Sequence, residues 1–101
     1  MGFTQIIIRH MLRSEALSER IHELSEELQG KHPEITLCRV VVESEGNHRH
    51  KGRPYLVSVN VRLPHGEIVA DRHEHEDVYV ALRDAFAAVE HQFAVPERLA
   101  A

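Results

Sequence analysis

The chain has 101 residues, enough for one small domain with a single core. Its 43% hydrophobic and 28% charged residues are typical of a folded globular protein and exclude a disordered or fibrous chain. No apolar run approaches the ~20 residues that a membrane-spanning helix needs, so we expect no membrane partner. Cys38 is the only cysteine, which excludes an intrachain disulfide, and no export signal precedes it. We therefore predict a cytoplasmic protein.

The net charge of −4, with histidines neutral, argues against a general nucleic-acid binder, but the charges are segregated along the chain. Residues 46–66 include four basic residues, three histidines and no acid, whereas residues 14–29 include five glutamates and one arginine. Such segregation can produce one cationic surface on an acidic protein.

A strand and an amphipathic helix are predicted at the start of the chain. Residues 3–9, FTQIIIR, are apolar and β-branched, as is typical of a strand. Ser14 can cap the N-terminus of a helix, and Glu15 adds a favourable charge in its first turn. One helix face then carries Leu17, Ile21, Leu24 and Leu28. We expect this helix to stop at Gly30, with Pro33 preventing its continuation.

Three further strands are predicted in the middle of the chain. Residues 35–43 are rich in branched side chains, and the polar segment 44–53 forms a loop after them. Residues 54–63 alternate in polarity, which predicts a strand with one buried and one wet face. The wet face is expected to hold Leu56, Ser58, Asn60 and Arg62, opposite Tyr55, Val57, Val59, Val61 and Leu63. A turn at Gly66 leads into a fourth strand, residues 67–73.

A second amphipathic helix is predicted to begin near His75 and to end before Pro96. Its buried stripe is expected to comprise Tyr79, Leu82, Phe86, Val89 and Phe93. The element order is therefore β-α-β-β-β-α, an α+β fold. We expect a parallel first strand pair with a right-handed crossover, and a four-stranded sheet with both helices packed on one face. The other face is left to solvent or to a partner.

Histidines and carboxylates near the start of this second helix raise the alternative of a metal site. His73 and His75 are two residues apart, so on an extended chain they project to the same side. Glu76, Asp77 or the histidines within 48–50 could complete a tetrahedral ligand set. Metal-binding histidines also need orienting partners, which no motif here supplies. We therefore predict no metal and no cofactor, and keep a histidine-based metal binder as the weakest hypothesis.

No motif in the sequence indicates an enzyme. A catalytic acid or base needs a desolvated pocket, whereas Glu76 and Asp77 lie in a polar connection. We expect both in the first turn of the second helix, where they complement its unpaired N–H groups. There is no nucleophile elbow, phosphate-cradling glycine loop or HExxH motif. Cys38 lies in an apolar strand, which favours an inert buried thiol. We predict no catalytic residues and no small-molecule substrate.

Two segments together resemble a known family. VNVRLPHGEIVA, residues 59–70, is followed by HEDVYVALRDAFAAVEHQF, residues 75–93. They resemble the ribosome hibernation-promoting factors, a family that includes the ribosome-associated inhibitors and the sigma-54 modulation proteins. Its members have a hairpin with a Pro/Gly-type turn and then an acidic-acidic-apolar-Tyr helix start. LRSEALSERI, residues 12–21, is similar to the start of the family's first helix. The resemblance covers nearly the whole chain.

The resemblance implies one hibernation-factor-like domain over residues 1–101, a short form without the C-terminal dimerisation domain of long members. It implies a stress-phase translation regulator that binds the RNA of the small ribosomal subunit in the mRNA and tRNA channel and inhibits translation. The alternative is a diverged protein-interaction module of the same fold that has lost ribosome binding.

The family's second helix usually has a basic face, but here Ala88 stands where lysine is common, and the first helix is acidic. Because phosphate neutralisation supplies most nucleic-acid affinity, binding should be weakened unless the basic segment 48–53 compensates. The candidate rRNA-binding residues are Arg49, Lys51, Arg53, Arg62, Arg72, Arg83 and His91. The first three could instead be a solvated loop, and Arg62 and Arg72 could form inter-strand ion pairs. We expect recognition of backbone and shape rather than base stacking, with Tyr79 in the core.

Overall fold

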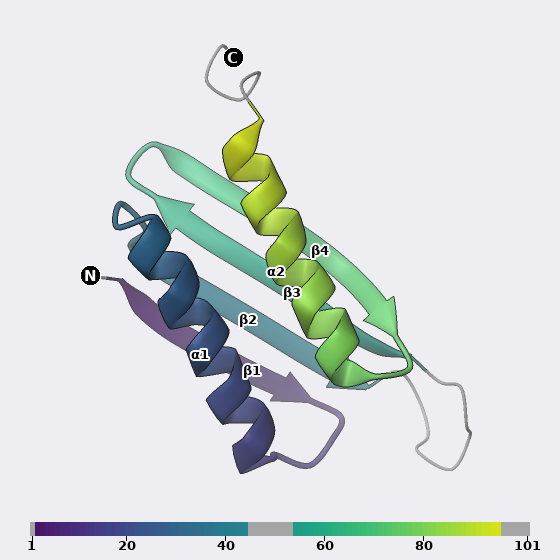
Figure 1. The fold of residues 1–101 in the computed structure, drawn as a ribbon. Coiled ribbons are helices and arrows are strands. Elements are labelled where there is room, and N and C mark those ends of the chain that lie inside the picture. The colour runs from purple at the N-terminus through teal and green to yellow at the C-terminus, as the bar shows by residue number, and fades with distance from the viewer. Residues whose placement is uncertain (1, 45–53, 96–101) are drawn as a thin grey trace.

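The computed structural model describes residues 2–44 and 54–95 and confirms the β-α-β-β-β-α order (Figure 1). The elements are β1 (Phe3–Arg9), α1 (Glu15–Lys31), β2 (Leu37–Ser44), β3 (Tyr55–Leu63), β4 (Gly66–His75) and α2 (Val78–Ala94). Each predicted element is present. The largest shift in a boundary is at α2, which begins three residues after its predicted start near His75, and β4 runs on to His75, two residues beyond its predicted end.

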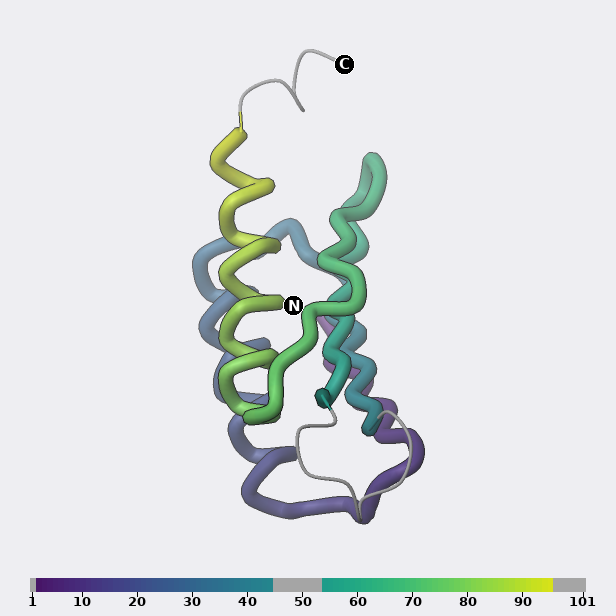
Figure 2. Tube along the Cα trace, turned by 90° about the vertical axis from the view of Figure 1, so that its right-hand side faces the viewer, coloured from purple at the N-terminus to yellow at the C-terminus, as the bar shows by residue number. Residues whose placement is uncertain are grey.

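The four strands form one sheet in the order β1-β2-β3-β4. β1 and β2 are parallel, as predicted, and Ile6 of β1 lies beside Val40 of β2. The two later pairs are antiparallel, with Val40 opposite Val59 and Val61 opposite Ile68. Both helices cover the same face of the sheet and leave the other face open (Figure 2). This confirms the predicted two-layer arrangement.

The core lies between the sheet and the two helices. Side chains in a strand alternate between its faces, so every second residue of the central strands meets the helices. The large side chains that are almost completely buried are Leu17, Ile21, Ile35, Val40, Val42, Val57, Val59, Val61, Ile68, Leu82 and Val89. α1 packs against β1, and α2 packs against β3 and β4. The helices thus bury the central strands on one sheet face, while Ile6 and Ile8 of the edge strand β1 are partly buried.

The first helix has the predicted N-terminal cap but a different end. The Ser14 hydroxyl accepts a hydrogen bond from the backbone N–H of Leu17 at 3.3 Å. The helix continues through Gly30 to Lys31, because Gly30 keeps a negative φ instead of taking the left-handed conformation of a C-terminal stop. The backbone N–H of His32 still donates to the carbonyl of Leu28 at 3.0 Å, and Pro33 follows.

The second helix is capped by a carboxylate and begins at Val78, three residues after its predicted start near His75. Asp77 is the cap, and its side chain accepts from the backbone N–H of Tyr79 at 2.9 Å. Glu76 precedes the cap and is not in the first turn. The prediction that Tyr79 is in the core is wrong, since its side chain is 44% exposed. The buried residues Ala81, Leu82, Ala85 and Val89 fix the centre of the stripe, so Tyr79 lies at its margin and Val78 is the partly buried residue of the first turn.

Leu56 departs from the expected wet face of β3. The register places it beside Glu43 and Glu74, on the open side as predicted, yet it is only 6% exposed. The open face is therefore shielded from solvent at one end, near the start of β3.

Candidate nucleic-acid interface

The open face of the sheet carries an arginine from each strand. Arg9 lies in β1, Arg39 in β2, Arg62 in β3 and Arg72 in β4, and all are exposed. The first three follow from strand alternation, because their neighbours on the same strand, such as Cys38 and Val61, point into the core. The fourth needs a separate explanation, since regular alternation would turn it toward the helices.

A β-bulge turns Arg72 to the open face. Val57 pairs with His73 and Val59 pairs with Ala70, so Ser58 alone lies opposite two residues, Asp71 and Arg72. The extra residue resets the alternation of β4, and Arg72 no longer points at the core. Arg72 adopts a φ of 52°, in the left-handed region that L side chains rarely occupy.

The Ser58 hydroxyl holds this bulge in place. It accepts a hydrogen bond from the backbone N–H of Arg72 at 3.0 Å. It also donates to the Asp71 carboxylate, Oδ1, at 3.1 Å. One side chain on β3 therefore satisfies the backbone group and the acid that the bulge leaves unpaired.

Three of the open-face arginines surround a shallow depression of about 280 Å³. Its lining spans all four strands and comprises Arg9, Arg39, Val41, Glu43, Ser58, Val59, Asn60, Val69, Asp71 and Arg72. Glu43 approaches Arg72 at 3.9 Å, the limit of an ion pair, and Asp71 is engaged by Ser58. Within residues 2–44 and 54–95, Arg9, Arg39 and Arg62 form no ion pair. The depression therefore offers guanidinium groups that are free to bind an anion.

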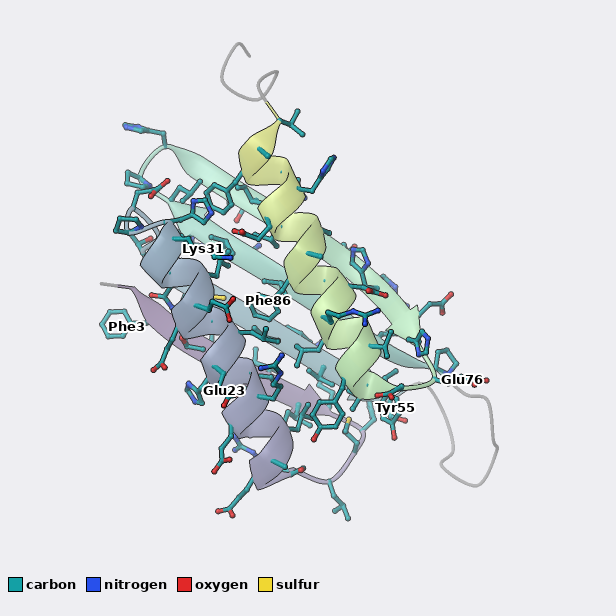
Figure 3. All side chains as sticks on the ribbon, viewed as in Figure 1. Phe3, Glu23, Lys31, Tyr55, Glu76 and Phe86 are labelled. Carbon is teal, nitrogen blue, oxygen red and sulfur yellow. The ribbon has the colours of Figure 1, made fainter. Side chains whose placement is uncertain are left out.

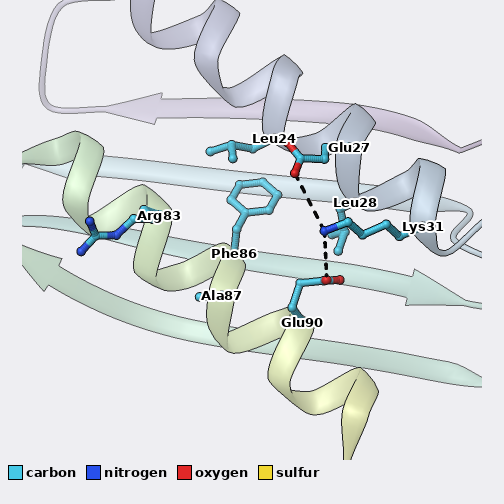
Figure 4. Close-up of a pocket in the computed structure, with 8 residues that line it drawn as sticks. All are labelled: Leu24, Glu27, Leu28, Lys31, Arg83, Phe86, Ala87 and Glu90. Carbon is cyan, nitrogen blue, oxygen red and sulfur yellow. Dashed lines mark ion pairs between the residues drawn. The ribbon is translucent and has the colours of Figure 1, made fainter.

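The helix layer on the opposite side is acidic, and its cations are paired. Arg20 lies 3.2 Å from Glu23, and Arg83 lies 3.4 Å from Asp84. Lys31 lies between two acids, 3.9 Å from Glu27 and 3.6 Å from Glu90 (Figure 4). α1 carries five glutamates against Arg20 and Lys31. This layer therefore lacks the basic face that the family's helices usually have.

A groove of about 140 Å³ separates the two helices, but it lacks the features of a polar binding site. Leu24, Leu28 and Phe86 provide its apolar surface, and Phe86 points into the space between the helices (Figures 3 and 4). The Lys31 ion pairs close one end, while Arg83 extends away from Lys31 at the other (Figure 4). The groove is mainly the seam where α1 meets α2.

The structure divides the candidate residues between two faces. Arg62 and Arg72 lie on the open sheet face, whereas Arg83 and His91 lie on α2, in the other layer. Three further candidates, Arg49, Lys51 and Arg53, lie outside the described residues. Sequence reasoning missed Arg9 and Arg39, which are single cations in otherwise apolar strands. The alternation of each strand places its arginine on the wet face and could have indicated both.

The other chemical candidates do not gather into a site. The described part of the chain contains no group of three or more histidine, cysteine or acidic residues that could hold a metal ion. The Nδ1 atom of His75 accepts from the backbone N–H of Asp77 at 2.9 Å, so this histidine helps to form the turn before α2. Cys38 is buried, as predicted, and burial raises the pKa of its thiol, partly offset by a hydrogen bond with Ser25. Among the described helices, none is long and apolar enough to cross a membrane.

Comparison with known proteins identifies relatives for almost the whole chain. The sequence model of the family described as Sigma 54 modulation protein / S30EA ribosomal protein matches residues 4–94. No curated protein matches the chain.

Two solved structures have a similar fold. A ribosomal subunit interface protein from Coxiella burnetii superposes with a TM-score of 0.75 and 23% identity, covering 91% of this chain and 93% of the other. The N-terminal domain of Protein Y from Thermus thermophilus superposes with a TM-score of 0.73 and 21% identity, covering 91% and 94%. At these identities the likeness supports the fold alone.

Proposed function

Because the chain belongs to the Sigma 54 modulation protein / S30EA ribosomal protein family, we propose that it is a ribosome-associated translation regulator that binds the small ribosomal subunit. The observation that carries the proposal is the extent of the family match, residues 4–94, which runs from β1 to the end of α2. This is the family of ribosome hibernation factors and ribosome-associated inhibitors. The protein would act in the cytoplasm, where ribosomes are.

The mechanism is occupancy of the mRNA and tRNA channel, without chemistry on a substrate. A folded domain bound there to ribosomal RNA excludes the messenger and the transfer RNAs. Guanidinium groups suit this role because they bind phosphate oxygens through paired hydrogen bonds. The arginines on the open face, Arg62 and Arg72 among them, support such contacts.

The other candidate contacts remain part of the proposal. Arg83 and His91 would meet RNA from the helix side of a channel that surrounds the domain. Arg49, Lys51 and Arg53 would add charge from the segment between β2 and β3.

A protein-interaction module of the same fold is the second candidate function. The acidic outer surface of α1, with its cations already paired, favours it over RNA contact by the helix layer. In that case a ribosome-independent partner would bind the protein, and neutralising Arg49, Lys51 and Arg53 would leave this binding unchanged.

Sedimentation with purified ribosomal subunits tests the proposal. The protein should pellet with small subunits, not with large ones, and the bound fraction should fall as salt is raised, because phosphate contacts release counterions. Inhibition of a cell-free translation reaction should follow the same salt dependence. Failure to pellet with small subunits even at low salt would remove the proposed function.

A further inference from the structure

We propose that the depression bounded by Arg9, Arg39 and Arg72 on the open sheet face binds consecutive phosphates of an RNA strand. The inference rests on the proposed function and names the surface that performs it. It places the main phosphate-contacting surface on the open sheet face. Arg9 and Arg39 are new members of this surface.

The chemistry of the depression suits a phosphodiester backbone. Each guanidinium can donate two parallel hydrogen bonds to one phosphate. Asn60 lies among the arginines and adds an amide that can donate to a phosphate or a ribose oxygen. Neighbouring strands are about 4.8 Å apart, so the lining from β1 to β4 spans roughly 14 Å. That width suits several phosphates in a row.

The bulge is the observation that points to a ligand. An arginine with a φ of 52° is strained, because an L side chain crowds the backbone in this region, and a glycine or asparagine there would relieve the strain. The Ser58 hydrogen bond holds this conformation, and its result is an arginine on the open face instead of against the core. Strain that is held in place and that presents a charged side chain is typical of binding sites.

Charge pairing separates this face from the helix layer. Among the described residues, the acid nearest to the Arg72 guanidinium is Glu43, at 3.9 Å. Because this arginine is exposed, a phosphate can displace the carboxylate at little cost. On the helix layer, Arg20 and Arg83 already have acids within 3.4 Å. Among the arginines and lysines of the described strands and helices, only Arg9, Arg39 and Arg62 form no ion pair with a described acid, and all three lie on the open face.

An exposed aromatic ring favours RNA over an acidic peptide as the ligand. The Thr4 hydroxyl bonds to Ser25 of α1, so the next side chain along β1, Phe3, faces the open side. Phe3 is 78% exposed and projects at the edge of the sheet (Figure 3). A base can stack on such a ring, whereas the side chains of an acidic peptide gain little from it.

Two double variants with the same charge change test the site. Arg9→Gln/Arg39→Gln removes two open-face cations, and Arg13→Gln/Arg20→Gln removes two from the other side of the molecule. Arg72→Asn is a third variant, because asparagine tolerates the left-handed backbone and removes only the guanidinium. Binding is measured by sedimentation with small subunits and by fluorescence anisotropy with a labelled single-stranded RNA, both over a salt series. Thermal melting checks that each variant is folded.

The open-face double variant should bind about tenfold more weakly at physiological salt. The slope of log affinity against log salt should shrink by about 1.4, since each phosphate contact on a single strand contributes about 0.7. Arg72→Asn should also bind more weakly, and the Arg13/Arg20 variant should bind like the wild type.

An equal loss of RNA affinity in the two double variants would contradict the proposed site. Wild-type affinity in the open-face variant would contradict it as well. Binding of polyglutamate as tightly as RNA would overturn the ligand class. If the wild type does not bind small subunits, both the proposed function and the proposed site are wrong. If the wild type binds and the open-face variant binds equally well, only the proposed site is wrong.

Discussion

The hydroxyl of Ser58 accepts a hydrogen bond from the backbone N–H of Arg72 at 3.0 Å and thereby holds an arginine in the left-handed conformation. The two residues lie on adjacent strands, β3 and β4, on the face of the sheet that no helix covers. The orientation of one charged side chain therefore depends on a neutral one, and this dependence can be tested separately from charge.

Replacing Ser58 by alanine should weaken RNA binding without removing any charge. The variant loses the bond to the Arg72 N–H and the bond to Asp71, so we expect a loss of about 1 kcal/mol in the free energy of unfolding, measured with urea. The RNA affinity should fall because Arg72 and the freed Asp71 carboxylate are no longer held. Unchanged affinity in a folded Ser58→Ala protein would show that the bulge does not position Arg72 for a ligand.

Arg72→Gly should separate stability from binding. Glycine removes the backbone cost of the left-handed conformation, which offsets its own entropic cost, so the urea midpoint should stay the same or rise. RNA binding should weaken because the guanidinium is gone. Arg62→Gly is the matched control, since Arg62 is in regular strand conformation and its replacement should cost about 1 kcal/mol of stability. A similar loss of stability in both variants would contradict the strained geometry at Arg72.

The contacts of His32 with α2 should stabilise the fold. Its ring stacks on Phe93 with centroids 3.7 Å apart, and its Nε2 atom lies 2.7 Å from Oε1 of Glu90. His32→Ala should lower the free energy of unfolding by about 1–2 kcal/mol, and His32→Phe should lose less because it keeps the stacking. His22→Ala, at an exposed position of α1, is the control and should leave stability unchanged. An equal cost for His32→Ala and His22→Ala would mean that the contact contributes nothing.

The Cys38 thiol should react slowly with iodoacetamide in the folded protein. Burial raises its pKa, so little reactive thiolate forms at pH 8, whereas in guanidinium chloride the same thiol should react at the rate of a free cysteine. The folded state holds the thiol proton more tightly than the unfolded state does, so the raised pKa also contributes to the free energy of unfolding. This contribution is complete below the thiol's ordinary pKa. The contribution is lost as pH rises through the raised pKa of the folded protein. Fast alkylation of the folded protein would show that the thiol is accessible.

Periodicity in the sequence predicts most of this fold. The valines of 54–63 recur every second residue, and Leu17, Ile21, Leu24 and Leu28 recur every third or fourth. The faces that these spacings predict are the buried ones. The prediction for Tyr79 fails because the buried stripe of α2 is centred between Leu82 and Ala85. Three residues correspond to a rotation of roughly 60° around a helix, so Tyr79 lies beyond Leu82 at the margin of the stripe.

The open-face site could be predicted only in part. Arg62 belongs to a visibly alternating strand, so its face follows from the sequence. Arg72 follows a single extra residue in β4, and that bulge depends on a hydrogen bond from another strand. Arg9 and Arg39 come close to Arg72 only through the register of the whole sheet, which no local pattern specifies.

Directed hydroxyl-radical probing of the small-subunit complex tests the central claim most directly. Because Cys38 is buried, a single iron chelate can be attached to an introduced surface cysteine, either Gln5→Cys beside Arg39 on the open face or Glu23→Cys on α1. We predict strong cleavage of the ribosomal RNA backbone from the chelate at position 5 and weaker cleavage from position 23. Strong cleavage from position 23 alone, or from neither position, would contradict an open sheet face bound to small-subunit RNA.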